Sequence, residues 1–304
     1  MIDTVLGSGY NLILRVPIVL KDKMFYSIIN YFNKEISNLI CIFSTRNKCK
    51  TMYNNLQTNK DKIIYIKKRK ITLSDSGNLL ICTPERLDAT LTFSSAHSWL
   101  NEFSVVIFYD FDLLLNDVRG NTLEACVIRI SRFNPFIQKI FISTDIKNIE
   151  HLTIWTKSYL IDFLKKGKKE YDSKFLEEEN VLTQSLIEIV SSNSRTLNDL
   201  KNFFKSSFAY FQGKKIPSLQ NILSTLINNG LIIKRKNYYP TPLGKICAGL
   251  RIPIKLQLRF IFELKKGTPP KVLIEKISKD NVNFYNWVCH GIESISKLIG
   301  EKHE

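Results

Sequence analysis

Short apolar runs alternate with amphipathic stretches along the first half of the chain. The apolar runs are rich in Ile, Leu, Val and Phe and occupy residues 11–20, 38–45, 62–68, 78–83, 105–115 and 137–144. Residues 25–36 and 48–57 lie between such runs and have the apolar spacing of helices. Continuous apolar runs separated by helices are typical of a parallel sheet that is buried on both faces. Residues 1–160 are therefore predicted to form an α/β domain.

The second half of the chain changes to helical periodicity. It begins with a charged segment, residues 161–180, which we interpret as a linker, with an exposed helix as the alternative. Three amphipathic patterns follow, at residues 181–190, 196–211 and 218–230. Ser218 is a candidate N-cap for the last pattern, and two short strand-like segments then flank a candidate turn at Lys236-Asn237. Three helices and a hairpin predict a winged-helix domain over residues 181–252, followed by a short helical tail over residues 253–304.

Composition narrows the class of protein. The chain has 304 residues, 44% of them hydrophobic, so two domains can each bury a core. Six scattered cysteines, with no histidines at ligand spacing, predict reduced thiols and no metal site. The first residues lack the features of a secretory signal, and no run approaches the roughly 20 apolar residues of a membrane span. The sequence thus predicts a soluble, cytoplasmic protein with no membrane partner.

Charge points to the class of partner. The formal net charge is +16, and a large positive excess favours a polyphosphate partner, because each neutralised phosphate releases condensed counterions. A solvated, lysine-rich surface is the alternative interpretation. Charge alone therefore favours nucleic acid without excluding a surface that binds nothing.

Several ordered segments carry a resemblance to a known family. They are the strand-like residues 11–17, Ser44-Thr45-Arg46, Thr83-Pro84-Glu85-Arg86, the apolar run at 105–115 with its Asp110 and Asp112, residues 117–130 and Ser143-Thr144-Asp145. In this order they resemble the archaeal superfamily 2 repair helicases of the Hjm and HelQ type, in the Ski-like group. The resemblance implies a RecA-like first domain, a winged helix and a tail that is a remnant of the family's ratchet domain. It also implies a truncated relative, because residues 161–180 leave no room for the family's second RecA-like domain.

The same resemblance places an altered ATP site in the first domain. Asp22 stands where the family has its phosphate-binding Lys, Lys23 stands at the Mg²⁺ ligand position, and the glycines of the phosphate loop are absent. In the acid box, Tyr109 and Asp110 replace the metal-positioning Asp and the water-activating Glu. We therefore expect no enzyme activity, no catalytic residues and no cofactor, with a shifted nucleotide site that uses Lys21 or Lys23 as the alternative.

Two sets of residues are candidates for binding nucleic acid. In the first domain, the resemblance implies that Arg46, Thr83 and Arg86 contact a DNA backbone, although Thr83 is also a good helix N-cap. In the winged helix, basic and polar groups surround the third helix and the wing, a placement that suits duplex binding. These residues are Lys214, Lys215, Ser218, Gln220, Asn221, Lys234, Arg235 and Lys236. In the resembled family this domain packs beside the helicase domains, so a protein-covered face is the alternative, and the basic run at residues 67–70 is a further candidate.

The sequence thus predicts a catalytically inactive, helicase-like protein that binds DNA or another nucleic acid in repair, recombination or replication. Single-stranded and branched DNA are both candidate forms, and the sequence does not choose between them. A different class of function stays open, namely a scaffold or regulatory subunit that binds an active helicase or nuclease without touching DNA itself. Exposed apolar residues would favour that second class.

Overall fold

The computed structural model describes residues 2–34, 37–57, 63–65, 78–92, 96–116, 119–164, 167–250, 252–278 and 285–300. These residues form two compact units. The first unit contains Met1–Lys174 together with Ser207–Gly213, and the second contains Phe175–Ser206 and Lys214–Glu304. The basic run at residues 67–70 lies outside the described residues.

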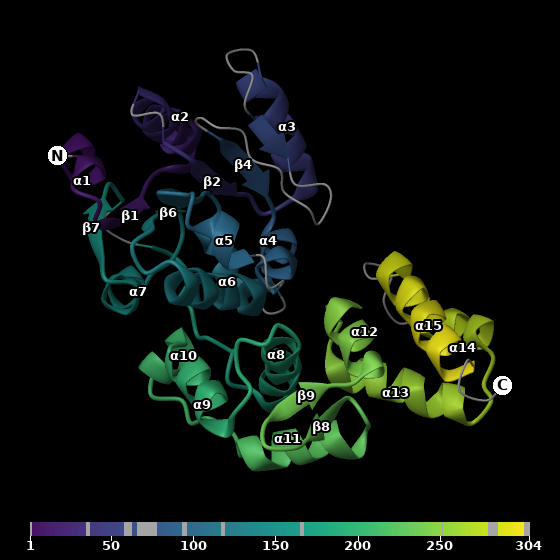
Figure 1. Cartoon of the computed structure of the whole chain (residues 1–304). Coiled ribbons are helices and arrows are strands. Elements are labelled where there is room, and N and C mark those ends of the chain that lie inside the picture. The colour runs from purple at the N-terminus through teal and green to yellow at the C-terminus, as the bar shows by residue number, and fades with distance from the viewer. Residues whose placement is uncertain are drawn as a thin grey trace. The chain divides into compact units, whose positions relative to one another are not determined.

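A parallel sheet forms the centre of the first unit (Figure 1). Its seven strands lie in the order β3-β4-β2-β5-β6-β1-β7, and every pairing is parallel. The strands are β1 (Asn11–Arg15), β2 (Leu39–Ile42), β3 (Ile63–Tyr65), β4 (Leu79–Cys82), β5 (Val105–Phe108), β6 (Gln138–Ser143) and β7 (Ser158–Asp162). The predicted α/β fold with a parallel sheet is confirmed.

Helices cover both faces of this sheet (Figure 1). One face packs against α1 (Ile2–Gly7), α2 (Ile18–Lys34) and α3 (Arg46–Gln57). The other face packs against α4 (Pro84–Leu91), α5 (Ala96–Leu100), the 3-10 helix η1 (Phe111–Leu115), α6 (Arg119–Phe133), α7 (Ile149–Thr156) and α10 (Phe208–Phe211). Within β1, Leu12 and Leu14 point into the first layer and Ile13 into the second, which is why a two-sided apolar run is needed.

Two of the apolar runs are divided between a strand and a helix. In the run at residues 11–20, β1 ends at Arg15 and α2 begins at Ile18, so only Val16 and Pro17 lie between them. In the run at residues 105–115, β5 ends at Phe108 and η1 begins at Phe111. A continuous apolar run does not mark where a strand ends and a helix begins. The pattern of apolar residues therefore could not predict these two boundaries.

The segment expected to be a linker carries regular structure at both ends. β7 ends within it at Asp162, and α8 begins within it at Glu178. The guanidinium of Arg15 is buried and bonds both the Asp162 carboxylate (Nε to Oδ1, 2.9 Å) and the carbonyl oxygen of Ile146 (3.0 Å). Beyond β7, a Cβ on Gly167 would lie 2.2 Å from that same carbonyl oxygen, so only glycine fits. These contacts bind β1, β7 and the residues after β6 to one another.

The second unit consists of helices and one hairpin. Its elements are α8 (Glu178–Val190), α9 (Leu197–Lys205), α11 (Leu219–Asn228), β8 (Ile232–Lys234), β9 (Tyr238–Pro240), α12 (Pro242–Leu250), α13 (Ile254–Lys265), α14 (Pro270–Ser278) and α15 (Tyr285–Gly300). As predicted, Ser218 caps α11, and β8 and β9 pair antiparallel around the Lys236-Asn237 turn. No described helix has the length and apolarity needed to cross a membrane.

The pattern at residues 196–211, expected as one helix, is two. Thr196 caps α9 with a reciprocal bond to Asp199, and α9 ends at Lys205. The next residues belong to the first unit because a buried carboxylate, Glu124 on α6, accepts the backbone N–H of Phe208 at 2.7 Å. Burial raises the pKa of Glu124, and hydroxyl donors that favour its ionised form oppose this effect. The buried carboxylate therefore accounts for the break, and the helical pattern gave no sign of it.

Candidate nucleic-acid interface

Two helix N-termini lie side by side at one edge of the sheet. β2 and β4 are paired in parallel, so the segments that follow them emerge at the same edge. After β2, Ser44 and Thr45 lead into α3, whose first residue is Arg46. After β4, Thr83 leads into α4. Helix N-termini carry unpaired N–H groups and a partial positive charge, so this edge is suited to an anion such as a phosphate.

The predicted residues at this edge differ in exposure. Arg46 is exposed and Arg86 is half-buried. Thr83 is buried, and its hydroxyl accepts the backbone N–H of Arg86 at 3.4 Å, so it acts as the N-cap of α4. Glu85 pairs with Arg119 at 2.5 Å, which connects the start of α4 to the start of α6. The structure thus brings Arg46 and Arg86 to one edge and gives Thr83 a folding role there.

The residues that the resemblance placed at an altered ATP site also meet at the carboxyl ends of the strands. The amine of Lys21 lies 2.7 Å from Oδ1 of Asp110 and 4.5 Å from the ring centre of Tyr109. The hydroxyl of Tyr109 donates to the carboxylate of Asp22, which also pairs with Lys48 at 3.4 Å. Lys48, which the sequence did not single out, lies 5.0 Å from the same ring centre. These five side chains form what we call the edge cluster.

Burial and pairing set the ionisation of this edge cluster. Burial opposes ionisation of Asp110, but the Lys21 ammonium and the donors of Ser44 outweigh it and lower the pKa of Asp110. Burial and the bond to Asp22 raise the pKa of Tyr109, so the phenol stays protonated and donates. At neutral pH the edge cluster therefore contains paired cations and carboxylates around one neutral phenol.

Asp110 connects the edge cluster to the helix N-termini. Its second oxygen, Oδ2, accepts the backbone N–H of Ser44 at 2.8 Å, immediately before Arg46. The nearby Asp112 accepts from the Ser143 hydroxyl at 2.8 Å and from the backbone N–H of Asp145 at 2.9 Å. It therefore joins η1 to the end of β6. Within the described part of the chain, no three His, Cys, Asp or Glu side chains are placed to hold a metal ion.

The start of α2 bears on nucleotide binding. The helix begins two residues after β1, and the side chains of its first turn, Ile18 and Val19, are 76% and 81% exposed. Lys23 is exposed further along the helix. A phosphate group placed here would need a cation, and Lys21 would have to leave Asp110 to provide it.

The second unit carries the other predicted residues. Ser218 is exposed at the start of α11, and its hydroxyl accepts the backbone N–H of Asn221 at 3.4 Å. Gln220 and Asn221 are exposed on the first turn, Lys215 is exposed before it, and Lys214 is half-buried. The end of β8 and the turn after it carry the exposed side chains of Lys234, Arg235 and Lys236. Two residues that the sequence did not single out, Arg195 and Tyr239, lie beside this turn, with the guanidinium 5.4 Å from the ring centre.

Comparisons with known proteins support part of the resemblance. No family model matches the chain. Over 84 residues the chain is 33% identical to the ATP-dependent DNA helicase Hel308 of Methanocaldococcus jannaschii, and over 171 residues it is 25% identical to the ATP-dependent DNA helicase MER3 of Saccharomyces cerevisiae. The chain is similar to DNA helicases. These matches cover 28% and 52% of this chain but only 7% and 13% of the relatives' own length.

One prediction is overturned by these relatives. The residues Asp22, Lys23, Tyr109 and Asp110 had led us to expect no enzyme activity. Both relatives are ATP-dependent DNA helicases, so this prediction is wrong. The prediction relied on single positions in one loop and at one strand end. Such positions alone do not decide the activity of a chain that matches its relatives only in part.

Proposed function

We propose that this helicase-related chain binds DNA in repair, recombination or replication. The observation that carries the proposal is the pairing of β2 with β4, which brings two helix N-termini with Arg46 and Arg86 to one sheet edge. Peptide N–H groups and arginine side chains at such an edge suit the phosphates of a DNA backbone. In this proposal the first unit is a RecA-like domain of the Hjm and HelQ type.

The second unit contributes a separate basic surface to the proposal. Its helices α8, α9 and α11 and the β8-β9 hairpin form a winged helix, with α13 to α15 as the helical tail. The first turn of α11 offers Ser218, Gln220 and Asn221, and the hairpin offers three successive cations, Lys234 to Lys236. A polar helix start with a basic wing suits contact with a groove and its flanking phosphates.

Salt-dependent binding of labelled single-stranded, duplex and forked DNA tests the proposal. Replacing Arg46 and Arg86 by Glu is expected to weaken binding at least tenfold and to lower the salt slope by about two. Arg132→Glu is the control, because it lies in the last turn of α6, at the opposite edge of the sheet. If wild-type protein bound none of the three DNAs at low salt, the proposal would be wrong.

A second function is favoured by one observation at the same edge of the sheet. Ile18, Val19 and Leu20 are exposed at the start of α2, and Phe163, directly after β7, is 49% exposed. The N–H of Phe163 donates to the carbonyl of Arg15 at 2.8 Å, which keeps it close to the start of α2. Grouped apolar side chains are typical of protein-binding surfaces, so we also propose a protein partner here. Replacing Val19 and Phe163 by Ser should abolish that interaction and leave DNA binding unchanged.

A further inference from the structure

The β8-β9 hairpin has an apolar and aromatic outer face. Ile232 is opposite Pro240 and Ile233 is opposite Tyr239 in the ladder. Because side chains alternate along a strand, Ile233 and Tyr239 share the face that points away from the buried Ile232. Ile233 is 40% exposed and Tyr239 is half-buried. An outward face of a small hairpin is ordinarily polar, so this pair calls for an explanation.

Arg195 completes this face from a different part of the chain. Its carbonyl accepts the N–H of Tyr238 at 2.9 Å, so the segment before α9 runs alongside β9. Its guanidinium donates to the Ser192 hydroxyl at 2.8 Å and lies 5.4 Å from the ring centre of Tyr239. The guanidinium is thus held over the ring of Tyr239. We call Arg195, Ile233 and Tyr239 the wing face.

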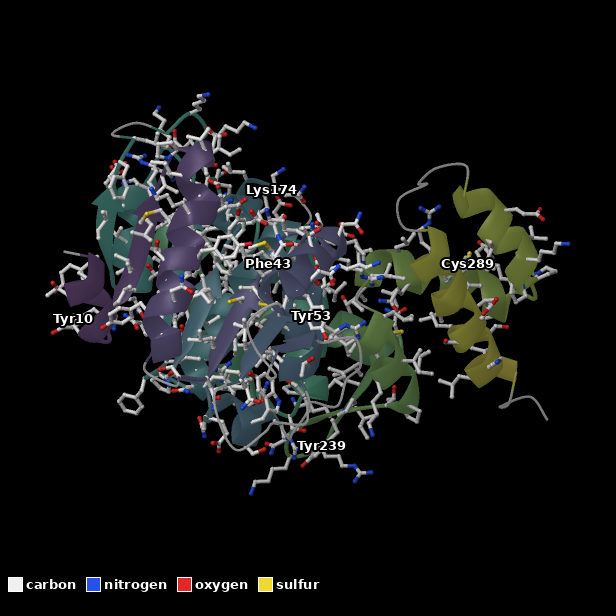
Figure 2. All side chains as sticks on the ribbon, turned by 90° about the horizontal axis from the view of Figure 1, so that it is seen from above. Tyr10, Phe43, Tyr53, Lys174, Tyr239 and Cys289 are labelled. Carbon is white, nitrogen blue, oxygen red and sulfur yellow. The ribbon has the colours of Figure 1, made fainter. Side chains whose placement is uncertain are left out.

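Cations border the wing face. Lys234 at the end of β8 and Arg235 and Lys236 in the turn are exposed, and no ion pair among the described residues involves them. Figure 2 shows Tyr239 at the margin of its unit. A planar ring, a planar guanidinium and an aliphatic side chain offer flat surface to the face of a base. The neighbouring cations offer charge to the phosphates on either side of it.

We propose that the wing face binds an unpaired base of a single-stranded DNA segment, with Tyr239 as the stacking surface. This inference rests on the proposed DNA binding and names the form of DNA that the wing face binds. The bases of a duplex are stacked on one another, so only an unpaired base presents its face to Tyr239. Every base has such a face, so the site is insensitive to sequence.

Tyr238 provides a matched control for the test. It lies next to Tyr239 but belongs to the other face of the hairpin, opposite Lys234 in the ladder. Fluorescence anisotropy would compare Tyr239→Leu with Tyr238→Leu on three DNAs, namely a blunt duplex, the same duplex with a single-stranded tail and the tail alone. Tyr239→Leu should weaken binding to both DNAs that contain the tail about tenfold and leave the blunt duplex unchanged. Tyr238→Leu should change none of the three by more than about twofold.

Two further variants separate stacking from folding. Tyr239→Phe keeps the ring and should bind the tail as wild type does, whereas Arg195→Gln should weaken it about threefold to fivefold. Equal loss on blunt and tailed duplexes, or equal effects of the two Leu variants, would overturn the inference while leaving DNA binding intact. Absence of DNA binding by the wild type would instead remove the proposed function itself. If Tyr239→Leu fails to unfold cooperatively, its binding cannot be interpreted. The test then rests on Tyr239→Phe, which should bind the tail as wild type does, and Arg195→Gln, which should bind it more weakly.

Discussion

The sheet edge of the first unit and the wing of the second unit use charge in opposite ways. At the sheet edge, Lys21 and Asp110 are mostly buried and 2.7 Å apart, and Asp110 also bonds the backbone of Ser44. At the wing, Lys234 and Arg235 are exposed, and no carboxylate of the described residues pairs with them. Paired and buried charges contribute to folding, whereas exposed and unpaired charges are available to a ligand. The difference separates charges that serve the fold from charges that serve binding.

The largest expected effect is on binding at the wing. Reversing the charge of Lys234, Arg235 and Lys236 to Glu should weaken DNA binding about 1000-fold and lower the salt slope by about three. Stability should change by less than about 0.5 kcal/mol, because these side chains are exposed.

A control for this experiment reverses three exposed lysines of α13 and α14, Lys255, Lys265 and Lys271, which gives the same change of net charge. That variant should keep most of the affinity. A loss of equal size in the control would mean that net charge, and not the wing, drives binding.

A buried cation that pairs with no carboxylate of the described residues extends the comparison. Lys139 on β6 is 4% exposed, and its amine donates to the carbonyl of Ile137 at 3.2 Å. Burial lowers the pKa of Lys139 to about 8 from its ordinary value of 10.5. Lys139→Met should therefore raise the free energy of unfolding at pH 7 by about 3 kcal/mol, since each pKa unit corresponds to about 1.4 kcal/mol.

The sign of the pH dependence follows from the lowered pKa. Between pH 8 and pH 10.5 the unfolded chain binds the Lys139 proton and the folded chain does not, so the stability of the wild type rises through this window. Urea unfolding at pH 7 and pH 10 should show a smaller rise in Lys139→Met than in the wild type. An unchanged rise, or a destabilised variant, would contradict this account of Lys139.

The fold was predicted where burial is two-sided and missed where it is not. The runs that contain β2 and β4 are apolar throughout because helices cover both faces of these strands. β7 is an edge strand of half-buried and exposed residues, so it lacks such a run, and its last two residues lay inside the expected linker. Local chemistry also predicted the Ser218 cap and the turn at Lys236-Asn237.

Sites made by tertiary contact were harder to predict. Lys48 joins the edge cluster from α3, and Arg195 reaches Tyr239 across 44 positions of sequence. No spacing rule relates such residues, because they meet only through tertiary contacts of the folded chain. The sequence therefore indicated basic surfaces, and the structure added which cations are paired and which aromatic rings lie beside them.

At the sheet edge the expected effect is on folding. Asp110→Ala would leave the mostly buried Lys21 ammonium without its carboxylate, and Ser44 without an acceptor for its N–H. The free energy of unfolding should fall by about 2 kcal/mol at pH 7, as measured by urea unfolding. The pKa of Asp110 is lowered in the folded state, so its contribution is complete above the ordinary carboxyl range and is lost as the pH falls through the lowered value. Asp110→Ala should accordingly lose less stability than the wild type on acidification.

The smallest expected effect is at Lys48, which is paired with a carboxylate but only partly buried. Its amine is 3.4 Å from Asp22, whose side chain is 58% exposed, so solvent screens the pair. Lys48→Met should therefore change the free energy of unfolding by less than about 0.5 kcal/mol.

Lys48 is nonetheless half-buried in the first turn of α3, two residues after Arg46, where a cation adds to the charge that an approaching phosphate meets. We expect DNA affinity to fall about twofold to threefold with a lower salt slope. A larger loss of stability than of affinity would instead mean that Lys48 stabilises the fold, as Lys21 does, and does not serve DNA binding.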